Sequence, residues 1–437
     1  MTGASRPNIL VIIVHDLGTH LGCYGNPSVE SPCLDAFAAE GTRFNRHFAT
    51  ACFCSPSRGA VFTGKHPHVN GLMGLVNLDW DLPEANSTLA MLLGEAGYET
   101  HLFGHQHEVK DVTRLGFQHL ADRSVGTECH GVADQAARFL RNRGQGRHPF
   151  YARVGFGEVH RPYERYEPAD PSSVAMPPFL TDTQGARQDV AMFHGAVRTM
   201  DQAVGTLLSA LDETGLRDDT VVVFTTDHGI AFPRAKSTLY DPGLNTALLM
   251  RWSGGLAGGR EADELLSNVD LMPTLLEVAG VQQPTDLTGR SFLSLLQGGR
   301  YEPNTEVFAE KNTHVDDHKR CIRTERHKYI RNYDDGPALR LPTDIEMSLT
   351  RRDMGDAHLG PRAEFELYDL EADPWEQENL AGSAARSEVE RDLACRLDAF
   401  LEATNDPILE GSVPRPPGEA DIILTLEARI RRHYADS

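Results

Sequence analysis

The sequence predicts an α/β protein with a large mixed, mostly parallel sheet sandwiched by helices and a smaller C-terminal α+β domain. Three observations support this prediction. Short apolar runs alternate along the chain with helical segments, which is typical of a parallel sheet covered on both faces. Polar residues follow directly after several of these runs. Beyond about residue 300 the apolar segments become shorter and lie among loops.

Buried strands are predicted where apolar and β-branched residues follow one another without a break. The clearest are NILVIIV at 8–14 and TVVVFTT at 220–226, because near-continuous apolar runs of this length mark strands that are buried on both faces. Further strands are expected at 42–48, 100–103, 150–156 and 247–252.

Helices are predicted between these strands. The first begins at Ser31-Pro32, an N-cap followed by proline at the first helical position, and ends at Gly41. Others are expected at 56–62, 89–95, 133–141, 190–211 and 271–279. Because strands and helices alternate, the connections are those of a parallel sheet.

The change to shorter apolar segments beyond about residue 300 predicts two domains. Residues 1–305 are expected to form the catalytic α/β domain. Residues 306–437 are expected to form a smaller domain with an antiparallel sheet, which includes segments 328–332 and 366–370, and with terminal helices. A chain of 437 residues is long enough for one large domain and a smaller one.

The charge balance limits the partners of the protein. Lys and Arg total 42 and Asp and Glu total 63, which gives a formal net charge of -21. A field of this sign repels nucleic acid and anionic membranes, so neither is an expected partner. A site for an anionic substrate therefore needs local cations. The sequence does not indicate the oligomeric state.

The N-terminus and the cysteines favour a cytoplasmic protein. The apolar run at 9–14 is too short for a signal-peptide core or a membrane span. The seven cysteines are odd in number and scattered, which does not suggest a disulfide framework. Cys52 and Cys54 have no matching pair elsewhere, so a structural zinc site is not expected. We expect a reducing compartment.

Polar residues stand directly after four predicted strands, where ligand sites of parallel sheets lie. They are His15-Asp16, 104–107, 158–160 and Asp227-His228. Parallel strands have their carboxyl ends at one edge of the sheet, so these groups are expected to form a single site.

The segment Cys54-Ser55-Pro56-Ser57-Arg58 is the sharpest local signal. Cys54 precedes a predicted helix start, where backbone N–H groups and the helix dipole favour an anion. Arg58 follows about one helical turn later and can direct a bidentate donor to the same anion. This pattern is typical of an activated nucleophile with an oxyanion clamp. A buried structural cysteine beside a helix-starting proline is the alternative that spacing alone leaves open.

CSPSRGAVFTG resembles the signature of the sulfatase family, which has an alkaline-phosphatase-like fold. PNILVIIVHDLG, TVVVFTTDHG, NVDLMPTLLEVAG, LTGRS and ELYDLEADPWEQENLA are similar to further landmarks of that family, in the same order. DHGIAFPRAKSTLYDPG and the HVNG segment at 68–71 are most similar to the heparan N-sulfatase (sulfamidase) branch. The resemblance covers nearly the whole chain.

This resemblance implies that a formylglycine-generating enzyme converts Cys54 to formylglycine during maturation. It also implies a divalent metal held by Asp16, Asp227, His228 and the modified Cys54, with His15 where the family usually has aspartate. The family metal is calcium, which prefers oxygen ligands. Two imidazoles instead favour manganese or zinc. As an alternative, His15 hydrogen-bonds the substrate or Asp227 without binding the metal.

Further roles follow from the same resemblance. Arg58 and Lys236 are implied to bind and stabilise the anion, and His160 to contact the scissile oxygen and protonate the leaving group with Lys236. His107 is implied to act on the formylglycine. His105 replaces a lysine that binds sulfate, so its contact with the substrate becomes titratable. The implied catalytic residues are thus Cys54, Arg58, His107, His160 and Lys236.

The implied function is hydrolysis of a sulfate ester or sulfamate, with N-sulfoglucosamine-type sugars first. A phosphonate monoester or phosphodiester hydrolase on the same scaffold is the main alternative, and His228 favours it. A non-catalytic binding protein is another, suggested by His15 and His105, and a Cys54 left unmodified would leave only weak activity. Residues 334–360 are expected to shape the substrate entrance. Contact of Arg340, Arg351 and Arg352 with an acidic sugar chain is one interpretation of this segment, and a solvated loop is the favoured one.

Overall fold

A computed structural model describes residues 6–143, 148–256, 258–312, 317–411 and 413–435. Its larger sheet has eight strands in the order β5-β4-β6-β1-β7-β8-β2-β9. Strands β4, β6, β1 and β7 run parallel, whereas β8 is antiparallel to both of its neighbours. The strands are β1 Asn8–Val14, β2 Thr42–Phe44, β4 Glu99–Gly104, β5 His119–Leu120, β6 Phe150–Gly155, β7 Thr220–Thr226, β8 Leu248–Arg251 and β9 Arg260–Ala262.

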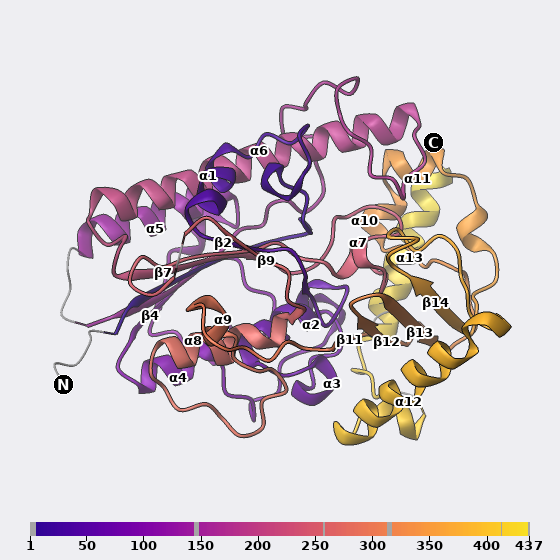
Figure 1. Cartoon of the computed structure of the whole chain (residues 1–437). Coiled ribbons are helices and arrows are strands. Elements are labelled where there is room, and N and C mark those ends of the chain that lie inside the picture. The colour runs from indigo at the N-terminus through magenta and orange to yellow at the C-terminus, as the bar shows by residue number, and fades with distance from the viewer. Residues whose placement is uncertain (1–5, 144–147, 257, 313–316, 412, 436–437) are drawn as a thin grey trace.

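Helices cover both faces of this sheet, as predicted (Figure 1). On one face lie α1 (Pro32–Glu40), α5 (Cys129–Arg143) and α6 (Gln184–Glu213). On the other lie α2 (Cys54–Thr63), α3 (Pro67–Asn70), α4 (Leu89–Glu95), α8 (Leu271–Val278) and α9 (Leu293–Leu296). Strand β1 packs on both layers, because Leu10, Ile12 and Val14 join the core on the first face. The alternate residues Ile9, Val11 and Ile13 join the core on the second.

A second, antiparallel sheet follows in the order β11-β12-β13-β14. Its strands are β11 Glu306–Lys311, β12 Lys319–Thr324, β13 His327–Asn332 and β14 Phe365–Asp369. It lies at one end of the large sheet, close to α2 (Figure 1). The remaining elements are β3 His47–Phe48, β10 Leu266–Ser267, α7 Asp241–Leu244, α10 Thr343–Glu346, α11 Leu349–Asp353, α12 Ser387–Ala403 and α13 Glu419–Ala435.

The predicted fold class is confirmed, while the bounds of several elements differ from the prediction; α5 and α6, for example, extend beyond the predicted 133–141 and 190–211. The expected strand at 42–48 is two short strands, β2 and β3, which pair with different partners, β8 and β10. Helix α2 begins at Cys54 rather than at 56, because proline is tolerated within the first helical turn. Within the described ranges, the helices lack either the length or the apolar character needed to cross a membrane.

Candidate active site

The candidate site lies where the carboxyl ends of four parallel strands meet the N-terminus of α2. Asp16 follows β1, Asp227 follows β7, His105 follows β4 and His160 follows β6. These strands are direct neighbours in the order β4-β6-β1-β7, so their ends converge. The chain turns sharply at Asp16, whose φ is +51°. Aspartate is among the few residues that tolerate this left-handed conformation.

Cys54 is the first residue of α2 and is 4% exposed. Its Sγ lies 3.3 Å from Nε2 of His228 and 4.0 Å from Oδ1 of Asp16. Burial alone would raise the pKa of the Cys54 thiol, but the charge of His228 and the ammonium of Lys236 bring that pKa well below its usual value. The residue therefore faces cationic partners that favour its thiolate.

Two buried carboxylates face this cysteine. One ligand atom each of His15, Asp16, Cys54 and Asp227 lies within 4.8 Å of the others, and all four residues are buried. Oxygen, imidazole and sulfur donors at this spacing fit a divalent ion, which would neutralise the two acidic charges. Burial would raise the pKa of Asp227, but His228, His15 and Arg58 around it hold that pKa well below the usual range.

His228 is oriented toward the same donors. Its Nδ1 lies 2.9 Å from the carbonyl of Gly229, which can only accept, so Nδ1 carries the proton. Its Nε2 then points to Oδ1 of Asp16, 3.2 Å away. A ring fixed by a backbone carbonyl in this way is typical of metal-binding histidines. Burial would lower the pKa of His228, but Asp227 and Cys54 raise it to about 9.

His15 enters the donor group through its Nδ1, which lies 2.9 Å from Oδ2 of Asp227. Both readings from the sequence, metal binding and contact with Asp227, are therefore compatible with its position. Burial and the nearby Arg58 would lower the pKa of His15, but Asp227 and Cys54 raise it well above its usual value.

Arg58 is fully buried beneath the carboxylates. Its Nε donates to Oδ2 of Asp227 at 3.0 Å and its Nη2 donates to the carbonyl of Val14 at 3.1 Å. Nη1 is buried and finds no hydrogen-bond partner among the described residues. The guanidinium thus holds Asp227 in place, and one of its nitrogens is left for an anion.

Lys236 connects the site to the C-terminal part of the chain. Its Nζ lies 2.8 Å from Oδ2 of Asp16 and 2.8 Å from Oδ2 of Asp344. Burial would lower the pKa of Lys236, but these two carboxylates raise it well above its usual value. Asp344, in α10, was not among the predicted site residues; its only sequence signal is its place in the 334–360 segment.

His160 lies beside Lys236 and is the most exposed of these side chains, at 38%. Its Nδ1 contacts the carbonyl of Arg161 at 2.6 Å and therefore carries a proton. Its Nε2 faces Nζ of Lys236 at 3.3 Å. The two side chains can thus exchange a proton and deliver it to a leaving group.

His105 and His107 lie close to His15. The His105 ring centroid is 4.5 Å from that of His15, and the His107 ring is 5.4 Å from that of His105. Burial, His15 and Arg58 all lower the pKa of His105 well below its usual value. A neutral ring does not supply the positive charge that anion binding by His105 would require.

All ten residues predicted for the site lie in this one region of the fold: His15, Asp16, Cys54, Arg58, His105, His107, His160, Asp227, His228 and Lys236. Two arginines of the 334–360 segment pair with acidic residues of the same segment. Arg351 pairs with Glu346 and Asp356, and Arg352 lies 3.7 Å from Asp353. That segment contributes a carboxylate, Asp344, to the site.

The sheet and the buried cysteine among metal-binding side chains define a hydrolase with an alkaline-phosphatase-like fold. Residues 7–281 match the family model described as Sulfatase, and residues 228–345 match the model described as N-sulphoglucosamine sulphohydrolase, C-terminal. The chain therefore belongs to the sulfatase family, as the sequence motifs predicted.

Named relatives align over most of their length. N-sulphoglucosamine sulphohydrolase of Homo sapiens is 29% identical over 473 residues, covering 92% of this chain and 91% of that protein. An ulvan-active sulfatase of Formosa agariphila is 28% identical over 432 residues, covering 94% of this chain and 83% of that protein.

Solved structures share the fold at lower identity. A protein solved with its substrate D-glucosamine-2-N,6-O-disulfate has a TM-score of 0.73 and 20% identity, covering 92% of this chain and 99% of that one. The phosphonate monoester hydrolase of Agrobacterium radiobacter has a TM-score of 0.70 and 23% identity, covering 94% and 100%. The same scaffold therefore occurs in proteins named for different substrates.

Proposed function

We propose that this sulfatase-family hydrolase cleaves the sulfamate or sulfate ester of a sulfated sugar, N-sulfoglucosamine-type sugars first, with a formylglycine made from Cys54. One observation carries the proposal: Asp16 contacts both halves of the site. Its Oδ1 faces His228 beside Cys54, and its Oδ2 faces Lys236 beside His160. Nucleophile and proton donors thus flank one carboxylate.

The surroundings of Cys54 fit the modified residue. Sγ stands where the aldehyde oxygen of formylglycine would lie, and both His228 and Asp16 face that position. The N-terminus of α2 favours negative charge there. Formylglycine would supply an oxygen nucleophile that can be released from the product without hydrolysis of a stable enzyme ester.

Asp16, Asp227, His228 and the modified Cys54 would hold the divalent metal, with His15 at the same carboxylates. The ion would polarise the substrate anion and lower the pKa of the nucleophile. Calcium fits the two carboxylates, and manganese or zinc fits a set that also contains imidazoles.

Positive charge for the substrate comes from the free Nη1 of Arg58 and from Lys236. Both side chains are buried, so their charges act in a medium that screens them less than water does. They form a local cationic pocket inside a protein whose net charge is -21, which satisfies the condition set by the composition.

Protonation of the leaving group falls to His160 and Lys236. Nε2 of His160 lies 3.3 Å from Nζ of Lys236, so a proton given up by His160 can be replaced from the ammonium. An amine leaving group needs such a proton more than a phenolate does. Together with the match to the N-sulphoglucosamine sulphohydrolase model, which spans Lys236 and Asp344, this favours a sulfamate.

The substrate is expected to enter past His160 and Asp344. Their side chains are 38% and 19% exposed, whereas that of Lys236 is 4% exposed. The 334–360 segment thus borders the entrance. An acidic group at this position would meet the amino or hydroxyl groups of a sugar rather than its sulfate.

A phosphonate monoester hydrolase is the second candidate, because the imidazole of His228 faces the donor group. A metal with nitrogen ligands suits a phosphonate as well as a sulfate. The two candidate functions differ in the anion that is hydrolysed, a sulfate or a phosphonate, so turnover of each substrate separates them.

The test uses the full chain produced with and without a formylglycine-generating enzyme. Peptide mass spectrometry across Cys54 is combined with release of sulfate from N-sulfoglucosamine and from 4-nitrophenyl sulfate, and of alcohol from a phenyl phosphonate monoester. We expect thiol-to-aldehyde conversion and sulfate release, both lost in Cys54→Ala. Conversion with turnover of the phosphonate alone would replace the proposal by the second candidate. An unmodified Cys54 and no turnover would refute both and favour a binding protein.

A further inference from the structure

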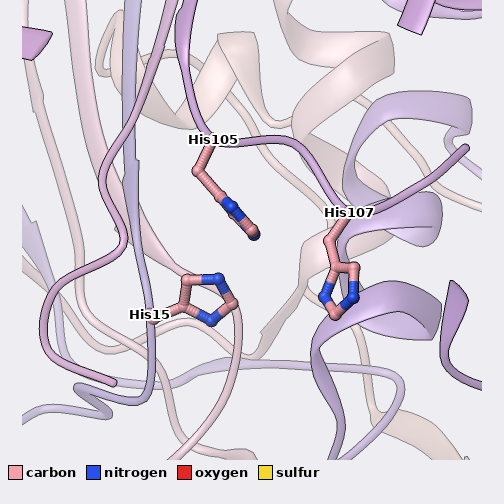
Figure 2. A group of neighbouring side chains, drawn as sticks. All are labelled: His15, His105 and His107. Atoms are coloured by element: carbon pink, nitrogen blue, oxygen red, sulfur yellow. The ribbon is translucent and has the colours of Figure 1, made fainter. Parts of the chain in front are cut away.

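His15, His105 and His107 form a compact group, which we call the histidine triad. One ring nitrogen of each lies within 4.8 Å of the other two. The ring centroids of His15 and His105 are 4.5 Å apart, and those of His15 and His107 are 6.3 Å apart. Figure 2 shows the three rings arranged around a common space, with His15 on one side and His105 and His107 entering from another segment.

The fold brings these side chains together across a strand. His15 follows β1 and His105 follows β4, while β6 lies between them in the sheet. The chain after β4 can cross the end of β6 because Gly155 has no side chain there. A Cβ at Gly155 would lie 2.0 Å from the carbonyl oxygen of His105. The backbone N–H of His105 also donates to the carbonyl of Gly155 at 2.8 Å.

The segment that carries two of the histidines is held by its own hydrogen bonds. Oε1 of Gln106 accepts from the N–H groups of Glu108 and Val109, at 3.0 Å and 3.2 Å. The N–H of His107 donates to Glu108 at 2.9 Å. Glu108 is buried and pairs with the buried Arg153 at 2.5 Å. The backbone that carries the two rings is therefore held in place before any ligand binds, while the rings keep freedom to rotate.

The triad also carries nitrogens that lack partners. Within the described residues, Nε2 of His105 and Nδ1 of His107 are buried and make no hydrogen bond, whereas Nδ1 of His15 faces a carboxylate oxygen of Asp227 at 2.9 Å. Buried polar atoms without partners are uncommon in proteins and call for a ligand or a water molecule. Here they occur in two members of one group, His105 and His107.

We propose that the histidine triad binds a divalent transition-metal ion of the zinc type, in addition to the ion held by the carboxylates. Three imidazoles, which bind a metal in their neutral form, are a ligand set for zinc, which binds nitrogen at about 2.0–2.1 Å in tetrahedral geometry. Such a geometry places the nitrogens about 3.4 Å apart, so ring nitrogens that now lie within 4.8 Å of one another have to approach by up to about 1.4 Å. Small side-chain rotations achieve this.

Three protein ligands leave a fourth position open, as in catalytic zinc sites. An anionic oxygen of the substrate can fill it. The contacts with substrate predicted for His105 and His107 would then pass through the ion, whose charge replaces the one that the neutral ring of His105 lacks. This consequence rests on the proposed function; the binding of the ion does not.

His15 belongs to both metal-binding groups, since its Nδ1 faces Asp227 and its ring lies beside His105. In metal-binding histidines one ring nitrogen binds the ion while the other commonly faces a carboxylate. Nδ1 of His15 faces Asp227, which leaves its Nε2 for the ion. By contrast, the buried group of His68, Glu310 and Asp406 is already paired with a cation, because Arg320 lies 2.5 Å from Asp406. It is not a second candidate.

The test measures metal binding rather than activity. Full-length protein with Cys54→Ala, which removes the competing thiolate, is freed of metal with a chelator and saturated with Ca²⁺. It is then titrated with Co²⁺, followed by visible absorption, and with Zn²⁺ against a chromophoric chelator. We expect one equivalent to bind, with imidazole ligands seen by X-ray absorption. His105→Asn and His107→Asn should each weaken binding at least about 100-fold.

Two controls keep the result specific. His130→Asn removes an exposed histidine, and His101→Asn removes a histidine from the separate Glu99, His101 and His119 group. Both should bind the ion like the parent, and circular dichroism should show that all variants fold. Binding that is unchanged in His105→Asn and His107→Asn, or lost only in His101→Asn, would overturn the proposal. So would the absence of micromolar binding in the parent.

Discussion

Nζ of Lys236 lies 2.8 Å from Oδ2 of Asp344, although the two residues are 108 positions apart in the chain. The same ammonium contacts Asp16 at 2.8 Å. Burial would raise the pKa of Asp344, but Lys236 and His160 keep it low, so the carboxylate stays charged beside them. Helix α10, from the C-terminal part of the chain, thus positions the side chains assigned to the leaving group.

Asp344→Asn should lower kcat for N-sulfoglucosamine by at least about tenfold, because Lys236 and His160 lose the carboxylate that orients them. The loss should be smaller for 4-nitrophenyl sulfate, whose leaving group needs no proton. Steady-state kcat and KM on both substrates measure this. Asp344→Glu should recover part of the rate, and Asp335→Asn, at an exposed position, should resemble the parent. Equal losses on the two substrates would contradict a role at the leaving group.

Removal of the divalent ion should lower the stability of the protein. Asp16 and Asp227 are fully buried, and an ion at 100 times its Kd adds about 2.7 kcal/mol to the free energy of unfolding. We expect a chelator to lower the Tm of the parent and to have little effect on Asp16→Asn, which has lost a ligand. Asp263→Asn, on the surface, should respond like the parent. A Tm that does not change with chelator would argue against metal binding by these carboxylates.

His68 should make the stability depend on pH. Burial would lower the pKa of His68, but Glu310 and Asp406 beside it raise that pKa. A raised pKa in the folded state means that the pair stabilises fully below the unfolded value of about 6.5 and that this contribution falls as pH rises through the folded pKa. The free energy of unfolding should therefore fall as the pH rises above about 6.5, by at most about 1.4 kcal/mol per pH unit from this residue. Urea unfolding of the parent and of His68→Gln across this range measures the effect. An unchanged slope in the variant would contradict it.

Gly155→Ala should be destabilising by about 1–3 kcal/mol, because the added Cβ would meet backbone, the carbonyl oxygen of His105, at 2.0 Å. Gly94→Ala is the matched control. Its Cβ would find only ordinary contacts of 3.7 Å and more inside α4, and alanine favours helix over glycine by about 0.5–1 kcal/mol. Urea unfolding should show a lower free energy of unfolding for Gly155→Ala and a higher one for Gly94→Ala than for the parent. A neutral Gly155→Ala would mean that the chain after β4 can move away from β6.

The strands and the polar residues at their ends were open to prediction from the sequence. In NILVIIV every residue after Asn8 is apolar, which predicted a buried strand. The structure packs alternate residues of this strand, β1, on opposite faces of the sheet. Because the carboxyl ends of parallel strands share one edge, Asp16, Asp227 and His160 could be placed together before any coordinates were known. The motif around Cys54 could identify the family because its residues are neighbours in the sequence.

Contacts between distant segments could not be predicted. Asp344 has no neighbouring motif, and only the packing of α10 against the site brings it to Lys236. The triad of His15, His105 and His107 likewise depends on the order β4-β6-β1 and on the missing side chain at Gly155. Sequence periodicity reports which residues of one segment are buried, since burial repeats along that segment. Which side chains of different segments meet is decided by strand order and chain crossing, which depend on the packing of the whole chain.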